Sequence, residues 1–303
     1  MTRKSWFLFA ALSVIWGLPY FMIRVALRQI DPGTLILFRT LPAALLIIPW
    51  AIATGRLTPI FAKFKWVLIY TVIEFGIPWL MMTTAEKHIT SSLTALLVGS
   101  VPLLAALLYR FTVVHEPFGP RRTVGLFLGA VGVALVVGLS VSGSSWIGVL
   151  LMVGCVVGYT LGPLIISLKL ADLPGPGVVG ASVGLVALAY LPWGATHLPA
   201  HLSFNVIAAV ACLSFICTAA GFLIFFALIV EIGPARTTLV TYINPAVAVL
   251  LGVLFLSEPF TIGIAIGFPL IILGSIMATG RSPGSLDEVS AKRGAELRRS
   301  GNQ

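Results

Sequence analysis

Charged residues are scarce in this chain: Asp, Glu, Lys and Arg make up 10% of its 303 residues, against about a quarter in soluble domains. Cysteines are few, and Cys155, Cys212 and Cys217 have no spacing typical of a disulfide framework or a zinc site. No metal and no cofactor is therefore expected. Hydrophobic residues, in contrast, make up 58% of the chain. This composition excludes a soluble globular enzyme, a disordered chain and a coiled coil.

Long apolar runs predict many membrane crossings, because a helix needs about 20 apolar residues to cross the hydrocarbon core. Apolar and polar residues do not alternate in these runs as they do in barrel strands. The predicted fold is therefore an all-α membrane protein with ten transmembrane helices. The spans are expected at residues 5–23, 33–55, 66–83 and 88–109, at two places within 123–168, at two within 173–230, and at 237–257 and 259–280.

Basic residues are divided unevenly between the two ends of these spans. With the N-terminus inside, fifteen Lys and Arg residues fall in inner segments and three, Arg24, Arg28 and Lys87, in outer loops. Basic residues near helix ends stay on the cytoplasmic side. We therefore predict a multi-pass protein of the inner (cell) membrane with both termini cytoplasmic and a disordered tail at 281–303. The net charge of +9 then reflects orientation, and no nucleic-acid partner is expected.

The second half of the chain repeats features of the first at an offset of 142–145 residues. Glu86 falls on Glu231, and the triplet Glu-Pro-Phe at 116–118 falls on the same triplet at 258–260. Five helices per half is an odd number, so the two halves would have opposite orientations in the membrane. Inverted repeats of this kind are typical of alternating-access transporters, which bind substrate near the midplane between the repeats. The predicted repeats are residues 1–140 and 141–280.

These repeated segments carry a family resemblance. Residues 85–138, with Pro102 and the triplet at 116–118, resemble the EamA-type repeat of the drug/metabolite transporter superfamily, and residues 230–280 resemble its second copy. The runs "IWGLPY" and "LFRTLPAALLI" are similar to the first two helices of that family. The resemblance implies ten helices in two inverted halves. It also implies transport, commonly outward, of a small metabolite such as an amino acid or a related polar or amphipathic compound.

Two charged residues fall inside predicted spans. Arg39 lies about six residues, or about 9 Å, into the second span. It either faces a cavity, where it would meet a substrate carboxylate or a gate, or extends to the outer headgroups. Glu74 is too short to extend far, so it is expected to face the cavity or a cation, or to hold a proton. Hydrocarbon disfavours its charged form, which suits Glu74 to proton coupling, and a local structural hydrogen bond is the alternative.

Polar and aromatic side chains deep in the spans complete the predicted substrate site. Trp16, Tyr20 and Tyr159 lie beside Pro19 or Pro163, where a proline opens backbone carbonyls toward a cavity. Asn244 precedes Pro245 in the middle of the ninth span. Aromatic residues elsewhere lie at span ends, where Trp and Tyr form interfacial belts. The predicted substrate-binding residues are therefore Trp16, Tyr20, Arg39, Glu74, Tyr159 and Asn244.

Two features admit other interpretations. Glycines four residues apart, as in Gly125/Gly129 and Gly263/Gly267, give the fifth and tenth helices small-residue faces. These faces would serve a scaffold or a homodimer. An intramembrane enzyme acting on a lipid or isoprenoid substrate is the alternative to a transporter. The predicted spans hold no cluster of catalytic Asp or His residues, so we expect no enzyme, and substrate-specific flux into liposomes separates the two classes.

Overall fold

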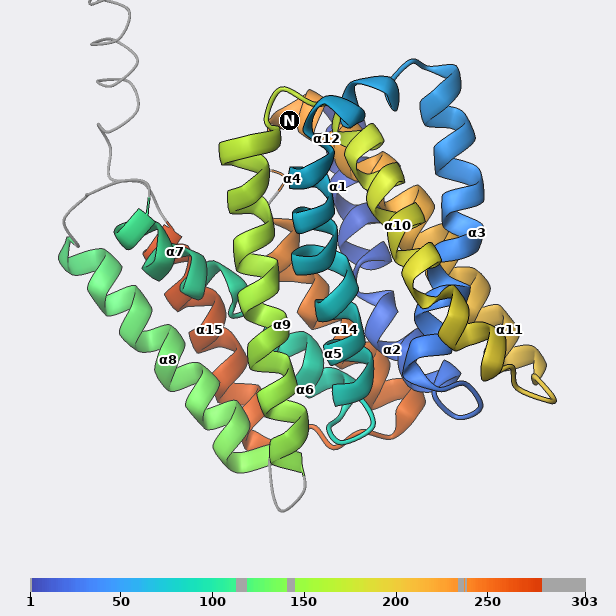
Figure 1. The fold of residues 1–303 in the computed structure, drawn as a ribbon. Helices are drawn as coiled ribbons and strands as arrows, with labels where there is room; N and C mark the ends of the chain where they lie inside the picture. Colours follow the sequence, from blue (N-terminus) through green and yellow to red (C-terminus); the bar gives the residue numbers. More distant parts are fainter. Residues whose placement is uncertain (1, 113–118, 141–144, 234–236, 238, 280–303) are drawn as a thin grey trace, which may run out of the picture.

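The structure, a computed structural model, describes residues 2–112, 119–140, 145–233, 237 and 239–279. All elements in these residues are helical (Figure 1). The first Glu-Pro-Phe triplet at 116–118 and the predicted tail at 281–303 lie outside the described residues. The elements before residue 141 are α1 (Arg3–Ile15), α2 (Leu18–Ala26), α3 (Pro32–Ala53), η1 (Thr58–Lys63), α4 (Phe64–Tyr70), η2 (Thr71–Gly76), α5 (Ile77–Ala85), α6 (Ser91–Val98), α7 (Val101–Thr112) and α8 (Pro120–Ser140).

The second part of the chain is built in the same way, from helices that follow one another directly or across short connections. Its elements are α9 (Ser145–Ile165), η3 (Ile166–Leu170), α10 (Gly175–Thr196), α11 (Phe204–Ala211), η4 (Cys212–Ala220), α12 (Gly221–Ile232), α14 (Val240–Leu256) and α15 (Ile262–Thr279).

Eight helical stretches of the described chain are long and apolar enough to cross a membrane, and α14 and α15 are shorter apolar helices. Many large apolar side chains face outward: Leu45 is 66% exposed and Val230 is 87% exposed. A surface of this kind suits contact with lipid. The prediction of an all-α membrane protein is therefore confirmed. The third span begins earlier than predicted, at Thr58, because η1 and α4 precede η2 and α5 without a break.

Three of the long stretches contain a π-helical turn: η2, η3 and η4. A π-helical turn leaves backbone groups without their usual helical partners, and such turns are frequent at functional sites. Another helix contacts the end of η2, because the Tyr190 hydroxyl of α10 donates to the Gly76 carbonyl at 2.9 Å. The first residues of η2 and η4 are 141 positions apart, close to the offset between the two halves.

The start of α3 is fixed by its capping residue. The Asp31 carboxylate accepts hydrogen bonds from the backbone amides of Gly33 and Thr34 at 3.0 and 3.2 Å. Pro32 follows at the first helical position, where its missing N–H costs nothing. The indole N–H of Trp193, from α10, donates to the same Asp31 oxygen at 2.7 Å. One side chain thus caps α3 and links it to α10, the helix against which α3 packs.

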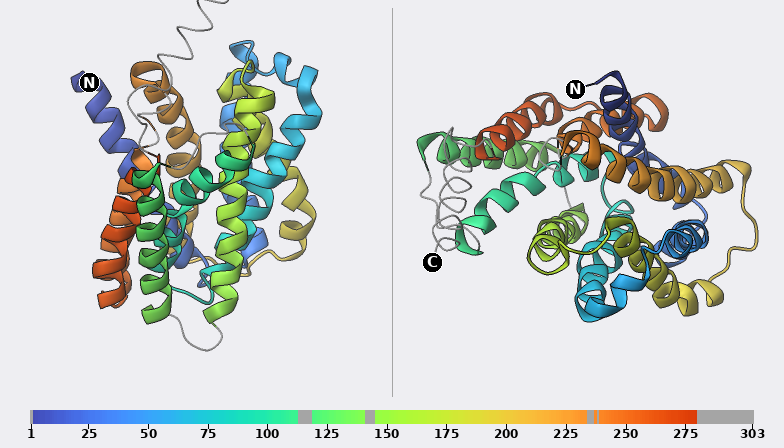
Figure 2. Two further views of the ribbon diagram at one scale, coloured as in Figure 1. Left: turned by 90° about the vertical axis from the view of Figure 1, so that its left-hand side faces the viewer. Right: turned by 90° about the horizontal axis from the view of Figure 1, so that it is seen from above.

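The α8 and α15 helices lie side by side along one edge of the bundle (Figure 2). Glycines make this approach possible: a Cβ atom at Gly132 would lie 2.7 Å from the Gly267 carbonyl oxygen, and one at Gly125 would lie 2.6 Å from the backbone nitrogen of Ala278. The predicted role in close packing is therefore seen, within one chain. The small-residue faces of α8 and α15 cover each other, and nothing in the described residues supports their use in a homodimer.

Candidate functional site

Arg39 points into the helix bundle. Its side chain lies on α3 and the residue is 7% exposed. Its Nε donates a hydrogen bond to Thr218 Oγ1 of η4 at 3.0 Å, and its guanidinium carbon lies 3.8 Å from the centroid of the Trp79 ring on α5. Among the described residues its terminal nitrogens form no hydrogen bond. The Arg39 side chain therefore faces the interior of the protein, which is the first of the two arrangements that the sequence allows.

The π-helical turn η4 orients the Thr218 hydroxyl for this contact. Its hydroxyl donates to the Leu213 carbonyl at 2.8 Å, a partner five residues earlier in the chain. The hydroxyl oxygen therefore remains available to accept from Arg39. The Thr218 side chain is fully buried. The Arg39 contact thus joins a helix of the first half to a helix of the second.

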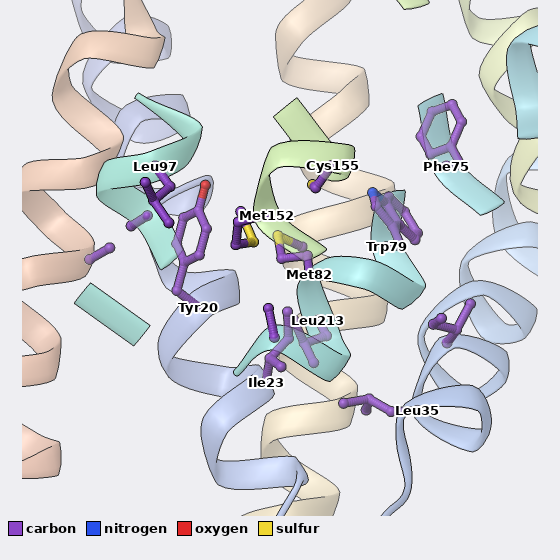
Figure 3. Close-up of a cluster of buried hydrophobic side chains, with 14 of the residues drawn as sticks. Tyr20, Ile23, Leu35, Phe75, Trp79, Met82, Leu97, Met152, Cys155 and Leu213 are labelled. Atoms are coloured by element: carbon purple, nitrogen blue, oxygen red, sulfur yellow. The ribbon is translucent and has the colours of Figure 1, made fainter. Parts of the chain in front are cut away.

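Tyr20 and Tyr159 lie near this arginine. Both phenols interact electrostatically with Arg39, and Tyr20 is 4% exposed on α2. Figure 3 shows Tyr20, Met82, Met152, Cys155 and Trp79 in one buried cluster. The surroundings of Arg39 are therefore aromatic, with Trp79, Tyr20 and Tyr159 beside it, a lining that favours amphipathic ligands and cations.

Glu74 lies within the π-helical turn η2 and faces α9. A Cβ atom at Gly162 would overlap its Oε2 atom, so the glycine is what admits the carboxylate to this place. Oε2 is buried and has no hydrogen-bond partner. In the described part of the chain Glu74 and Arg39 form no ion pair, but Tyr159 interacts electrostatically with both. Tyr159 is thus the residue that interacts with both the carboxylate and the guanidinium.

The remaining two predicted residues lie apart from this group. Trp16 follows α1, and its ring packs on Phe222 and Phe225 with centroid separations of 5.6 and 5.0 Å. Asn244 lies on α14, is 6% exposed, and its Oδ1 has no hydrogen-bond partner. A Cβ atom at Gly17 would lie 2.9 Å from the Asn244 carbonyl oxygen. These residues therefore surround the break between α1 and α2. The structure brings together Tyr20, Arg39, Glu74 and Tyr159.

Three residues near the site were not predicted from the sequence. Trp79 is one of several tryptophans in apolar runs, and Thr218 is a common residue type with no distinguishing spacing. Glu86 had a signal, its repetition at Glu231, but it follows the third predicted span and was placed in an outer loop. In the structure Glu86 is fully buried.

Glu258 is a further buried carboxylate, and its partners are on α6. Oε1 accepts from the backbone amide and hydroxyl of Ser91 at 2.7 and 2.9 Å. Oε2 accepts from the amide and hydroxyl of Ser92 at 2.9 and 2.5 Å. The four donors include backbone amides of the first turn of α6, which no helical carbonyl can satisfy. The turn that contains Glu258 therefore anchors α6.

Two surface cavities have been located in the described part of the chain, and neither is lined by Arg39 or Glu74. One, of about 480 Å³, lies at the start of α4 between Phe61 and Lys169. The other, of about 180 Å³, lies between α3 and α11 beside Phe38 and Phe215. Arg39, Tyr20 and Trp79 are 7%, 4% and 4% exposed, so a solute would need a more open conformation to reach them.

Comparison with known proteins agrees with the membrane fold. The model of the EamA-like transporter family matches residues 4–138 and again residues 146–280. The chain is 26% identical over 251 residues to YedA of Escherichia coli (strain K12), named an uncharacterized inner membrane transporter, and the match covers 80% of this chain and 79% of YedA. It is 23% identical over 281 residues to YvbV of Bacillus subtilis (strain 168), named an uncharacterized transporter, with 91% of each chain covered.

A relative with a more specific name comes from Salmonella typhimurium (strain LT2). It is named a probable amino-acid metabolite efflux pump and is 24% identical over 296 residues, which cover 90% of this chain and 94% of the relative. A solved crystal structure shares the fold with a TM-score of 0.63 over 92% of this chain and 97% of its own. At 17% sequence identity that likeness concerns the fold alone.

Proposed function

Since this chain belongs to the EamA-like transporter family, whose model matches both of its halves, we propose that it is a secondary transporter. It moves a small metabolite, an amino acid or a related polar or amphipathic compound, outward across the inner membrane by alternating access. The single observation that carries the proposal is the buried Arg39, held between Trp79 of α5 and Thr218 of η4. A charge placed at this depth is costly and is usually functional.

The ten-helix, two-repeat arrangement is part of this proposal. Equivalent helices of the two halves pack on each other: α3 on α10, α6 on α14 and α8 on α15. The π-helical turns η2 and η4 fall at equivalent positions. We propose that α14 and α15 cross the membrane like the eight longer stretches, so that residues 1–140 and 141–280 form inverted repeats. The two halves then rock against each other around Arg39, Tyr20 and Tyr159.

The roles of the site residues follow from their chemistry. The terminal nitrogens of Arg39 suit a bidentate pair with a substrate carboxylate, since Nε already donates to Thr218. Trp79, Tyr20 and Tyr159 would contact the apolar part of the substrate. Glu74, whose Oε2 lacks a partner, would bind the coupling proton or the substrate amine. Trp16 and Asn244 would line the path at the break between α1 and α2.

The name of the Salmonella relative supports an amino-acid-like substrate and the outward direction. The distribution of basic residues supports cytoplasmic termini. Figure 1 marks the N-terminus at the end of the bundle where α1 begins. The homodimer through α8 and α15 stays a prediction. The absence of enzymatic activity also stays a prediction. No observation favours the lipid-acting enzyme over the transporter.

Purified protein in liposomes tests the proposal. Liposomes preloaded with a mixture of unlabelled amino acids are given one labelled amino acid at a time. A transporter of this class accumulates its substrate transiently, and the initial rate saturates with substrate concentration. Flux equal to that of empty liposomes for every amino acid, with properly folded protein, would contradict the proposed substrate class.

A further inference from the structure

Glu86 is a carboxyl group without partners. It follows α5 directly, none of its surface is exposed, and neither of its carboxylate oxygens has a hydrogen-bond partner. Glu74 has one unpartnered oxygen and Glu258 has none. Glu86 is therefore the least satisfied carboxyl in the described part of the chain.

The nearest cation does not neutralise this carboxyl by direct contact. The Nη1 of Arg24, on α2, donates to the backbone carbonyl of Glu86 and, at 3.4 Å, to that of Ile89. The guanidinium thus binds carbonyls of the α5–α6 connection and forms no hydrogen bond with the Glu86 carboxylate. Glu86 interacts electrostatically with Arg24 and Tyr20 of α2, Arg39 of α3 and Glu258. Lys87 and His88 follow it directly in the chain.

The repeat provides a comparison within the same molecule. Glu231 is the equivalent of Glu86 in the second half, and it forms an ion pair with Lys4 at the surface. Among the residues that the structure describes, Glu86 has no such partner. Removing a carboxylate ion from water without a hydrogen bond or a bonded cation costs several kcal/mol or more, and such a group takes up a proton instead. In the conformation described here, the burial of Glu86 without a hydrogen-bond partner therefore favours its protonated form.

We propose that Glu86 is a proton-binding site of the transport cycle, loaded from water at the end of the bundle opposite the start of α1. In a conformation open at that end, the Glu86 carboxylate accepts a proton from hydronium and a water molecule is released. Closure then buries the neutral acid, as in this structure. Opening on the other side returns the proton to water. The proposal rests on the alternating access proposed above, but the presence of the proton site is measurable without any substrate.

The site is tested by infrared spectroscopy on purified protein in detergent, without substrate. A difference spectrum between alkaline and acidic pH reports the C=O stretching band of each carboxylic acid that titrates. We expect Glu86→Gln to remove one such band from the spectrum. Glu231→Gln is the matched control: it alters the equivalent position of the other repeat, so it should remove only the band of residue 231 and leave in place the band that Glu86→Gln removes.

An unchanged spectrum in folded Glu86→Gln protein would overturn the proposal, and loss of the same band in Glu231→Gln would do so as well. If Glu86→Gln does not fold, Glu86→Asp decides instead. A shorter side chain in the same place moves the midpoint of the band's titration if the band belongs to residue 86, and an unmoved midpoint contradicts the assignment. Failure of the proposed function gives a different result: a titrating Glu86 band together with no amino-acid flux in liposomes.

Discussion

The Arg39 guanidinium lies over the indole ring of Trp79, with 3.8 Å between the guanidinium carbon and the ring centroid. The two residues come from α3 and α5, and Trp79 is 4% exposed. A cation over the face of an aromatic ring gains about 2 kcal/mol or more when both are removed from water. This contact offsets part of the cost of placing a charge inside the bundle.

Replacing Trp79 therefore affects stability as well as transport. Trp79→Ala removes the ring from a buried site and leaves Arg39 without its stacking partner. We expect a loss of about 3–5 kcal/mol of stability and a smaller loss for Trp79→Phe, which keeps an aromatic face. The measurement is the thermal unfolding midpoint in detergent. Trp50→Ala is the control, because Trp50 faces Arg56 at 5.0 Å and is 37% exposed; an equal shift in both variants would contradict the buried contact.

The carboxylate of Glu258 should be essential for the anchoring of α6. Glu258→Gln turns one acceptor oxygen into an NH₂ group that faces donors from Ser91 or Ser92. Buried donors left without an acceptor cost about 1–3 kcal/mol, so the unfolding midpoint should fall. Glu231→Gln, which breaks a surface ion pair, should lower it by much less. In a Ser91→Ala/Ser92→Ala background, Glu258→Gln should lower the unfolding midpoint by less. An equally large decrease there would contradict the anchoring of α6 by Glu258.

Stability at acid pH should depend on Asp31. Burial acts to raise the pKa of Asp31, but hydrogen bonds from Thr34, Trp193 and Gly33 outweigh it and hold the pKa below its usual value. The unfolded chain has the higher pKa, about 3.9. The contribution of Asp31 is therefore present above that pH and is lost as the pH falls through the lower folded-state pKa.

Unfolding midpoints of the wild type and Asp31→Asn, measured from neutral to acid pH, check this dependence. We expect the gap between the two proteins to narrow as the pH falls, since the wild-type carboxylate then gains a proton. Trp193→Phe removes one of the donors to Asp31 and should raise the pH at which the gap narrows. A gap that stays constant over the whole range would show that the Asp31 carboxylate does not stabilise the start of α3.

The close contact between α8 and α15 predicts that a larger side chain in place of Gly132 destabilises the protein. A Cβ atom there would lie 2.8 Å from the backbone nitrogen of Ile271, so Gly132→Leu must push the two helices apart. We expect a loss of about 1–3 kcal/mol. Gly138→Ala is the control on the same helix, because a Cβ atom at that position meets no atom within 4 Å. An unchanged unfolding midpoint in Gly132→Leu, together with loss of a dimer, would instead favour the homodimer.

The sequence predicted the membrane fold because length and hydropathy alone decide whether a segment can cross a bilayer. It also placed Arg39 and Glu74 inside the helices, since their cost in hydrocarbon makes them conspicuous. It could not identify Trp79 or Thr218 as partners of Arg39. Which helices face one another is decided by packing across the whole bundle, and an apolar run that is hydrophobic on every side gives no direction.

Two carboxylates show the same limit. Glu258 lies in a repeated triplet that the sequence makes conspicuous, but the sequence does not reveal its partner Ser91, which lies 167 residues away. The sequence predicts that Glu86 lies outside the third span, because both Glu86 and the following Lys87 are charged. The structure buries it because the connection between α5 and α6 folds back onto Arg24 of α2, a contact that no local pattern encodes.

Counterflow in liposomes with wild-type protein and Arg39→Gln tests the central claim most directly, namely that Arg39 recognises the carboxylate of a transported metabolite. Once a labelled amino acid shows saturable flux, it is competed with unlabelled amino acid and with the amine that lacks its carboxylate. We expect the amino acid to compete, the amine not to compete, and Arg39→Gln to lower the flux by at least about tenfold, the equivalent of about 1.4 kcal/mol. Equal competition by the amine, or undiminished flux in Arg39→Gln, would contradict the account.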